Sequence, residues 1–111
     1  MNGLARLDLP WGVFLISRDG KHTRQLAGAL KYTSAPAWSP NGEWLAVSYG
    51  PRRSVDEGLW LINVTTGKRR LVFRNSRLSS PSWLPDGRTL IVGSTRTDRA
   101  RFYVIHLAST P

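Results

Sequence analysis

The sequence lacks cysteine and long apolar runs. Without cysteine, its 111 residues can form neither disulfides nor thiolate metal sites, and they offer no cysteine nucleophile. No apolar run approaches the roughly 18 residues of a membrane-spanning helix. The nearest candidate, LPWGVFLIS, follows Asp8, ends at Arg18 and Asp19, and precedes no small-residue cleavage site, so it is not recognised as a signal peptide. We expect it to be a strand, and we expect no membrane insertion.

Acidic residues are also scarce. The chain has 7 Asp and Glu against 16 Lys and Arg, a formal net charge of +9. Most of these cations are arginines, whose planar fork of donors matches carboxylate and phosphate groups, so the charge could attract an acidic partner. A compositional bias spread over solvated loops is the favoured alternative, because no block of five or six like charges occurs.

Two internal repeats are present. The segments APAWSPNGEWLAVS and SPSWLPDGRTLIVG match at six positions with one offset of 45 residues, as Pro36 and Pro81 illustrate. A second series, GVFLISR, GLWLINV and RFYVIHL, starts at Gly12, Gly58 and Arg101. A period of about 40 to 45 residues is typical of β-propeller blades.

The local chemistry predicts four strands in each repeat. Tight hairpin turns are expected where glycine follows a turn-forming residue, because glycine supplies positive φ. These turns are Asp19-Gly20, Asn41-Gly42, Thr66-Gly67 and Asp86-Gly87. Each repeat has a short proline-flanked strand, two apolar strands and a basic strand, the order of edge, centre, centre and edge that a blade requires. We therefore predict an all-β chain of four-stranded antiparallel propeller blades.

The repeats divide the chain into about two to two and a half blades of an open or partial propeller. Residues 1–34 are expected to hold the second to fourth strands of one blade, beginning with a weakly indicated strand over 4–9. Residues 35–79 form a complete blade, and residues 80–111 hold the first three strands of another. Closed propellers have about four to eight blades. The chain is therefore a fragment, which is favoured, an open stack, or one subunit of a closing oligomer.

The signature SPxW(S/L)P(N/D)G, followed by two apolar strands and a basic one, resembles the TolB-type β-propeller repeat, a relative of WD-type repeats. The resemblance covers nearly the whole chain and departs at Leu84, where the other copy has Ser39. It implies a protein-interaction scaffold, often in bacterial envelope or extracytoplasmic settings. The alternative is the non-catalytic propeller of a prolyl-oligopeptidase-like hydrolase, with the chemistry outside these residues.

Catalytic signatures are missing from the sequence. It has no nucleophile elbow, no metal-binding histidine pair and no phosphate-cradling glycine loop. Only His22 and His106 could serve as a base for a hydroxyl nucleophile. His106 aligns with Asn63 and Ser17, which indicates a structural polar position. We expect no enzymatic activity, no cofactor and no metal.

A binding surface is better supported. In a blade, the loops between the second and third strands and between successive blades emerge at one end, and such loops commonly carry function. The candidate partner-binding residues in these loops are Arg52, Arg53, Arg74, Arg77, Arg96, Arg99 and Arg101. We expect a protein partner with an acidic surface, or self-association through exposed apolar blade faces. Nucleic acid fits the charge alone, without a recognised nucleic-acid motif.

Overall fold

The computed structural model describes residues 12–28, 34–49, 55–95, 100–109 and 111. Within these ranges the chain forms strands and no helix, which confirms the all-β prediction. The strands are β1 (Gly12–Ile16), β2 (Thr23–Gly28), β3 (Ala37–Trp38), β4 (Trp44–Tyr49), β5 (Gly58–Asn63), β6 (Arg69–Arg74), β7 (Ser82–Trp83), β8 (Thr89–Ser94) and β9 (Arg101–His106).

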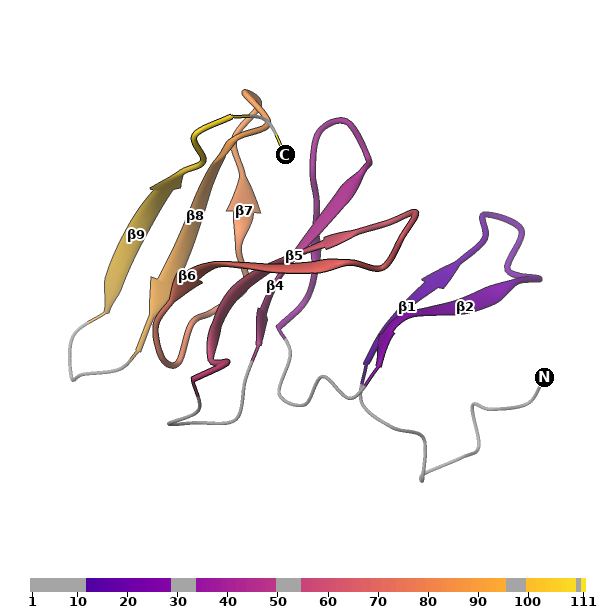
Figure 1. Cartoon of the computed structure of the whole chain (residues 1–111), viewed down its shortest axis with the longest axis horizontal. Helices are drawn as coiled ribbons and strands as arrows, with labels where there is room; N and C mark the ends of the chain where they lie inside the picture. The colour runs from indigo at the N-terminus through magenta and orange to yellow at the C-terminus, as the bar shows by residue number, and fades with distance from the viewer. Residues whose placement is uncertain (1–11, 29–33, 50–54, 96–99, 110) are drawn as a thin grey trace.

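The strands form three antiparallel sheets that follow one another along the chain. Their orders are β1-β2, β3-β4-β5-β6 and β7-β8-β9, and they lie side by side in chain order (Figure 1). The second sheet has the four-stranded order expected for a blade. The expected boundaries between residues 34 and 35 and between 79 and 80 fall between sheets and stay predictions. The strand expected over residues 4–9 lies outside the described residues.

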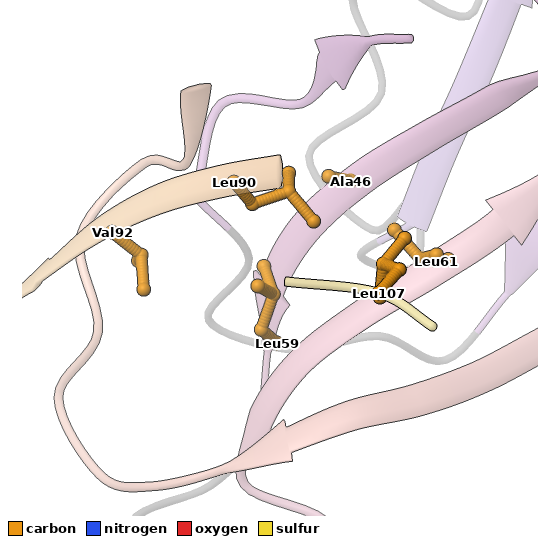
Figure 2. Packing of buried hydrophobic residues seen from close by; sticks show 6 residues of the cluster. All are labelled: Ala46, Leu59, Leu61, Leu90, Val92 and Leu107. Carbon is orange, nitrogen blue, oxygen red and sulfur yellow. The ribbon is translucent and has the colours of Figure 1, made fainter. Parts of the chain in front are cut away.

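The apolar cores lie between the sheets. Successive residues of a strand point to opposite faces, so the two apolar central strands of the second sheet cover both of its neighbours. The first cluster joins Val13 and Leu26 of the first sheet to Leu45, Val47 and Ile62 of the second. The second cluster joins the second and third sheets and consists of Ala46, Leu59, Leu61, Leu90, Val92 and Leu107, whose side chains gather in one layer (Figure 2).

Hydrogen bonds connect neighbouring sheets at several strands. We call β3 and β7, the first strands of the second and third sheets, inner strands, and β2 and β6, the last strands of the first and second sheets, outer strands. At the inner strands, the Trp83 indole Nε1 donates to the Ala37 carbonyl (3.0 Å). The Ser48 hydroxyl donates to the Ser79 carbonyl (2.5 Å). On the outer side, Arg24 Nη2 donates to the Val64 carbonyl at the β5–β6 turn (2.7 Å). Apolar packing and these directional bonds therefore fix how the sheets stack.

The tight turns use a recurring side-chain arrangement. Before β4, the Ser39 hydroxyl donates to Asn41 Oδ1 (2.7 Å) and accepts from the Trp44 backbone N–H (3.1 Å). Between β1 and β2, the Ser17 hydroxyl donates to Asp19 Oδ1 in the same way (2.6 Å). The glycine that follows has positive φ in both turns, 76° at Gly42 and 75° at Gly20. Side-chain hydrogen bonds and the positive φ of glycine therefore both stabilise the predicted hairpin turns.

In the turn before β8, the hydroxyl that binds the turn carboxylate comes from a different residue. Leu84 stands where Ser39 stands in the second sheet, so this turn has no hydroxyl at that position. Instead, the buried Thr89 hydroxyl donates to Asp86 Oδ2 (2.6 Å) from the opposite side of the turn. Asp86 Oδ1 also accepts from the backbone N–H groups of Arg88 and Thr89. The departure at Leu84 is therefore compensated by Thr89.

These turn bonds predict that the stability of the protein declines in acid. The Thr89 hydroxyl and then the Arg88 N–H lower the pKa of Asp86, and the Ser17 hydroxyl and then the Lys21 N–H lower the pKa of Asp19. A carboxyl whose pKa is lower in the folded state stabilises above its unfolded pKa of about 3.9. That contribution is lost as the pH falls through the folded pKa.

We expect the double variant Asp19→Asn/Asp86→Asn to lose less unfolding free energy than the wild type between about pH 4 and pH 2. An amide keeps one acceptor oxygen, as Asn41 does in the second sheet, but does not titrate in this range. Asp86→Asn also loses the acceptor of the Thr89 hydroxyl, which lowers stability at every pH without adding a pH dependence. The reciprocal variant Asn41→Asp should steepen the decline. Urea denaturation across the pH series measures both effects, and parallel curves for all three proteins would contradict the assignment.

The pairing of each outer strand shows a second repeated feature. The register shifts between Val13 and Phe14 where β1 pairs with β2, and between Leu59 and Trp60 where β5 pairs with β6. These are matching positions of the repeat. At the adjoining Gly58, a Cβ atom would meet the Phe73 carbonyl oxygen. At this point β6 therefore lies so close to β5 that no side chain would fit at position 58.

Candidate partner-binding surface

One end of the stacked sheets gathers the strand ends that the candidate arginines flank. We call it the loop end: it is where β4, β6 and β8 finish and where β5 and β9 begin. Cross-strand pairs define it, with Gly58 opposite both Tyr49 and Arg74 in the second sheet and Arg101 opposite Ser94 in the third. The Ser48–Ser79 hydrogen bond joins this end of the second sheet to the segment that leads into the third.

Three candidate arginines lie at the loop end with exposed side chains. Arg74 is the last residue of β6 and Arg101 is the first residue of β9. Arg77 lies in the connection from β6 to β7, with φ of 52° in the left-handed region. Arg52, Arg53, Arg96 and Arg99 lie outside the described residues. The structure thus brings the three described candidates to one end, and their role in binding stays a prediction.

The backbone that carries Arg77 is held on both sides. Its N–H donates to Glu57 Oε2 (2.8 Å), and its carbonyl accepts from the Thr95 N–H (3.2 Å). Next to it, the Ser76 carbonyl accepts from the Ser94 hydroxyl (3.1 Å). Two neighbouring sheets therefore fix this connection while the guanidinium remains exposed.

Glu57 has a structural role that its sequence position did not reveal. In the sequence it is one of the few acidic residues opposing the loop arginines. In the structure its side chain is buried and caps the Arg77 N–H. A hydrogen bond from a backbone N–H to a buried carboxylate is charge-assisted and therefore strong. The only sequence signal is its place directly before Gly58, where β5 begins.

The two histidines do not form a nucleophile–base pair with a described hydroxyl. His106 Nδ1 lies 3.2 Å from Thr89 Oγ1. The Thr89 hydroxyl donates its proton to Asp86, so it can only accept from the imidazole, whereas a catalytic base must accept the proton of its nucleophile. His22 is exposed after the turn, and its backbone N–H donates to the Ser17 hydroxyl.

Neither a metal-ligand group nor a membrane span is found in the described part of the chain. No three side chains among its histidines, aspartates and glutamates gather closely enough to hold a metal ion. The described ranges also contain no helix with the length and apolar character to cross a membrane.

Similarity to known proteins agrees with a propeller-blade fold. No protein-family model matches the chain. The Tol-Pal system protein TolB of Nitratidesulfovibrio vulgaris is 26% identical over 95 residues, which cover 86% of this chain and 21% of that protein. A TolB homolog of Chlorobaculum tepidum is 32% identical over 98 residues, covering 88% and 22%.

A solved structure gives the same result at the level of the fold. The crystal structure of TolB from Acinetobacter baumannii superposes with a TM-score of 0.69 at 20% sequence identity. The match covers 88% of this chain and 24% of that one. The chain spans between a fifth and a quarter of the length of each of these relatives. It is therefore a TolB-like stretch of a β-propeller.

Proposed function

We propose that this chain is a non-catalytic protein-interaction scaffold whose loop end binds an acidic surface of a partner protein. The observation that carries the proposal is the fixed backbone of Arg77 at the loop end, which also holds the exposed Arg74 and Arg101. The similarity to a Tol-Pal system protein supports a scaffold rather than a propeller attached to a hydrolase.

The physical basis is preorganised charge. A guanidinium presents a planar fork that pairs with a carboxylate through two parallel hydrogen bonds. Because hydrogen bonds from both sheets hold the Arg77 backbone, less conformational entropy is lost when a partner binds. The overall charge of +9 would also steer an acidic partner toward the chain.

The test compares two triple variants with equal loss of charge. Arg74→Ser/Arg77→Ser/Arg101→Ser removes three cations from the loop end, and Lys21→Ser/Lys68→Ser/Arg88→Ser removes three from the opposite end. With immobilised polyglutamate as the probe, we expect the first variant to bind about 10-fold more weakly, at roughly 0.5 kcal/mol for each exposed pair. The second should bind within about 3-fold of the wild type.

Two outcomes would count against the proposal. Equal losses in both variants would mean that net charge, not the loop end, determines binding. Tighter binding to a single-stranded oligonucleotide than to polyglutamate, with a steep salt dependence, would instead indicate a nucleic-acid partner. A further variant, Arg52→Ser/Arg53→Ser/Arg96→Ser/Arg99→Ser, tests the remaining candidates and should also reduce capture.

A further inference from the structure

Each apolar cluster is built from two different kinds of blade face. The second sheet turns Leu45, Val47 and Ile62 toward the first sheet, and it turns Leu59 and Leu61 toward the third. The first kind is called here the leading face, because it meets the sheet that precedes it in the chain. The second kind is called the trailing face. Both internal interfaces therefore pack a trailing face against a leading face.

The third sheet has a trailing face that no described residue covers. The repeat places Phe102 and Val104 at the positions of Leu59 and Leu61. Leu59 and Leu61 are fully buried, whereas Phe102 is 76% and Val104 56% exposed. Ile91, the cross-strand partner of Val104, lies half-buried on the same face.

No described residue covers the leading face of the first sheet either. Phe14 and Ile16 occupy the repeat positions of Trp60 and Ile62. Ile62 is fully buried against the first sheet, but Ile16 is 67% exposed and Phe14 is also exposed. Among the described residues, one face of each kind is therefore exposed, on the sheets at the two ends of the stack (Figure 1).

We propose that the chain associates head to tail with a second copy of itself, the trailing face around Phe102 and Val104 packing on the leading face around Phe14 and Ile16. The two internal clusters supply the pattern, since both join a trailing face to a leading face and neither joins like to like. The trailing face begins at Phe102, next to Arg101 of the loop end, but successive side chains of β9 point to opposite faces of the sheet. The inference uses the apolar faces and not the exposed arginines, so it does not depend on the proposed function.

Charge sets the conditions under which this association is expected. Two chains that each carry a charge of +9 repel one another, and the repulsion is screened by salt. Burial of apolar surface is not weakened by screening. Self-association should therefore strengthen as sodium chloride is added, whereas capture of an acidic probe at the loop end should weaken. The two behaviours separate this inference from the proposed function.

The decisive experiment is a complementation test by sedimentation equilibrium on the full 111-residue chain. Val104→Asp places a carboxylate on the trailing face and Ile16→Asp places one on the leading face. Each variant alone should associate at least about 100-fold more weakly than the wild type, because the interface would bury an unpaired charge. Mixed together, they should form a one-to-one dimer through the one intact pair of faces.

A matched control is Val55→Asp, since Val55 is exposed at the loop end and lies on neither face. It should associate like the wild type. Thermal unfolding of each variant checks that it is folded. If either aspartate variant fails to fold, Val104→Thr and Ile16→Thr replace the pair, with a weakening of about 10-fold alone and recovery on mixing.

Three results would overturn the proposal. A wild-type chain that remains monomeric across the concentration and salt series would remove its basis. Failure of the two variants to associate on mixing would show that this pair of faces does not form the interface, and wild-type association of either variant alone would indicate pairing of like faces. Equal weakening by Val55→Asp would show that added charge, and not the position on a face, controls association.

Discussion

Leu61→Ala is expected to lower the free energy of unfolding by about 2–5 kcal/mol. Leu61 is fully buried between the second and third sheets, where it packs in one cluster with Leu90 and Leu107. Truncation removes apolar contacts and leaves a cavity that two hydrogen-bonded sheets cannot easily collapse to fill. Urea denaturation followed by tryptophan fluorescence measures the loss.

The repeat provides its own control. Val104 stands at the equivalent position of the third sheet but is 56% exposed, so Val104→Ala should cost less than about 1 kcal/mol. The measurement is made at low protein concentration and low salt, where self-association is weakest. Similar losses in both variants would mean that the two positions have the same surroundings, contrary to the structure.

Gly58→Ala should destabilise the protein by about 3 kcal/mol, near the upper limit for overpacking. A Cβ at Gly58 would meet the Phe73 carbonyl oxygen and would lie 2.8 Å from Leu71 Cδ1 and 3.0 Å from Arg74 Cα. Two of these three contacts are to backbone atoms of β6, so rotation of a side chain cannot relieve them. The outer strand would have to separate from β5.

Gly20→Ala isolates the effect of backbone conformation from that of space. Gly20 has a φ of +75°, and a Cβ there would meet no atom within 4 Å. Its substitution should cost only about 1–2 kcal/mol, the strain of a left-handed residue. Thermal or urea unfolding of both variants decides the comparison. A Gly58→Ala chain as stable as the Gly20→Ala chain would show that β6 does not approach β5 so closely.

The sequence predicted the strands and turns well because both depend on local chemistry. Glycine after Asp19 and Asn41 marks tight hairpins, and the basic run after Gly20 and the apolar run after Gly42 are each long enough for one strand. Even the short inner strands around Trp38 and Trp83 were predicted, since their prolines exclude long ladders. The 45-residue offset then indicated how the strands repeat.

Features that depend on a neighbouring sheet could not be predicted in this way. Trp38 and Trp83 are equivalent in sequence, yet Trp83 contacts the second cluster and bonds to Ala37, whereas Trp38 is 54% exposed. The compensation of Leu84 by Thr89 requires the paired register of the turn. Identical residues thus have different surroundings according to what packs beside them.

The candidate surface was predictable only in part. Arg74 and Arg101 follow from the strand ends, because chain order places those ends together. The left-handed conformation of Arg77 did not follow, since arginine seldom adopts positive φ without support. That support comes from the Glu57 side chain, which accepts the Arg77 N–H, and nothing in the local sequence indicates this contact.

The close approach at Gly58 has a consequence for the third sheet. Glycine occupies this position in β1 and β5, the two strands that pair with an outer strand, but in β9 the position is Arg101. A strand laid along β9 in the register of β6 would bring its backbone against the Arg101 Cβ. We therefore expect Arg101 to hinder fibril-like edge-to-edge growth along β9, a protection that β5 does not need because β6 covers it.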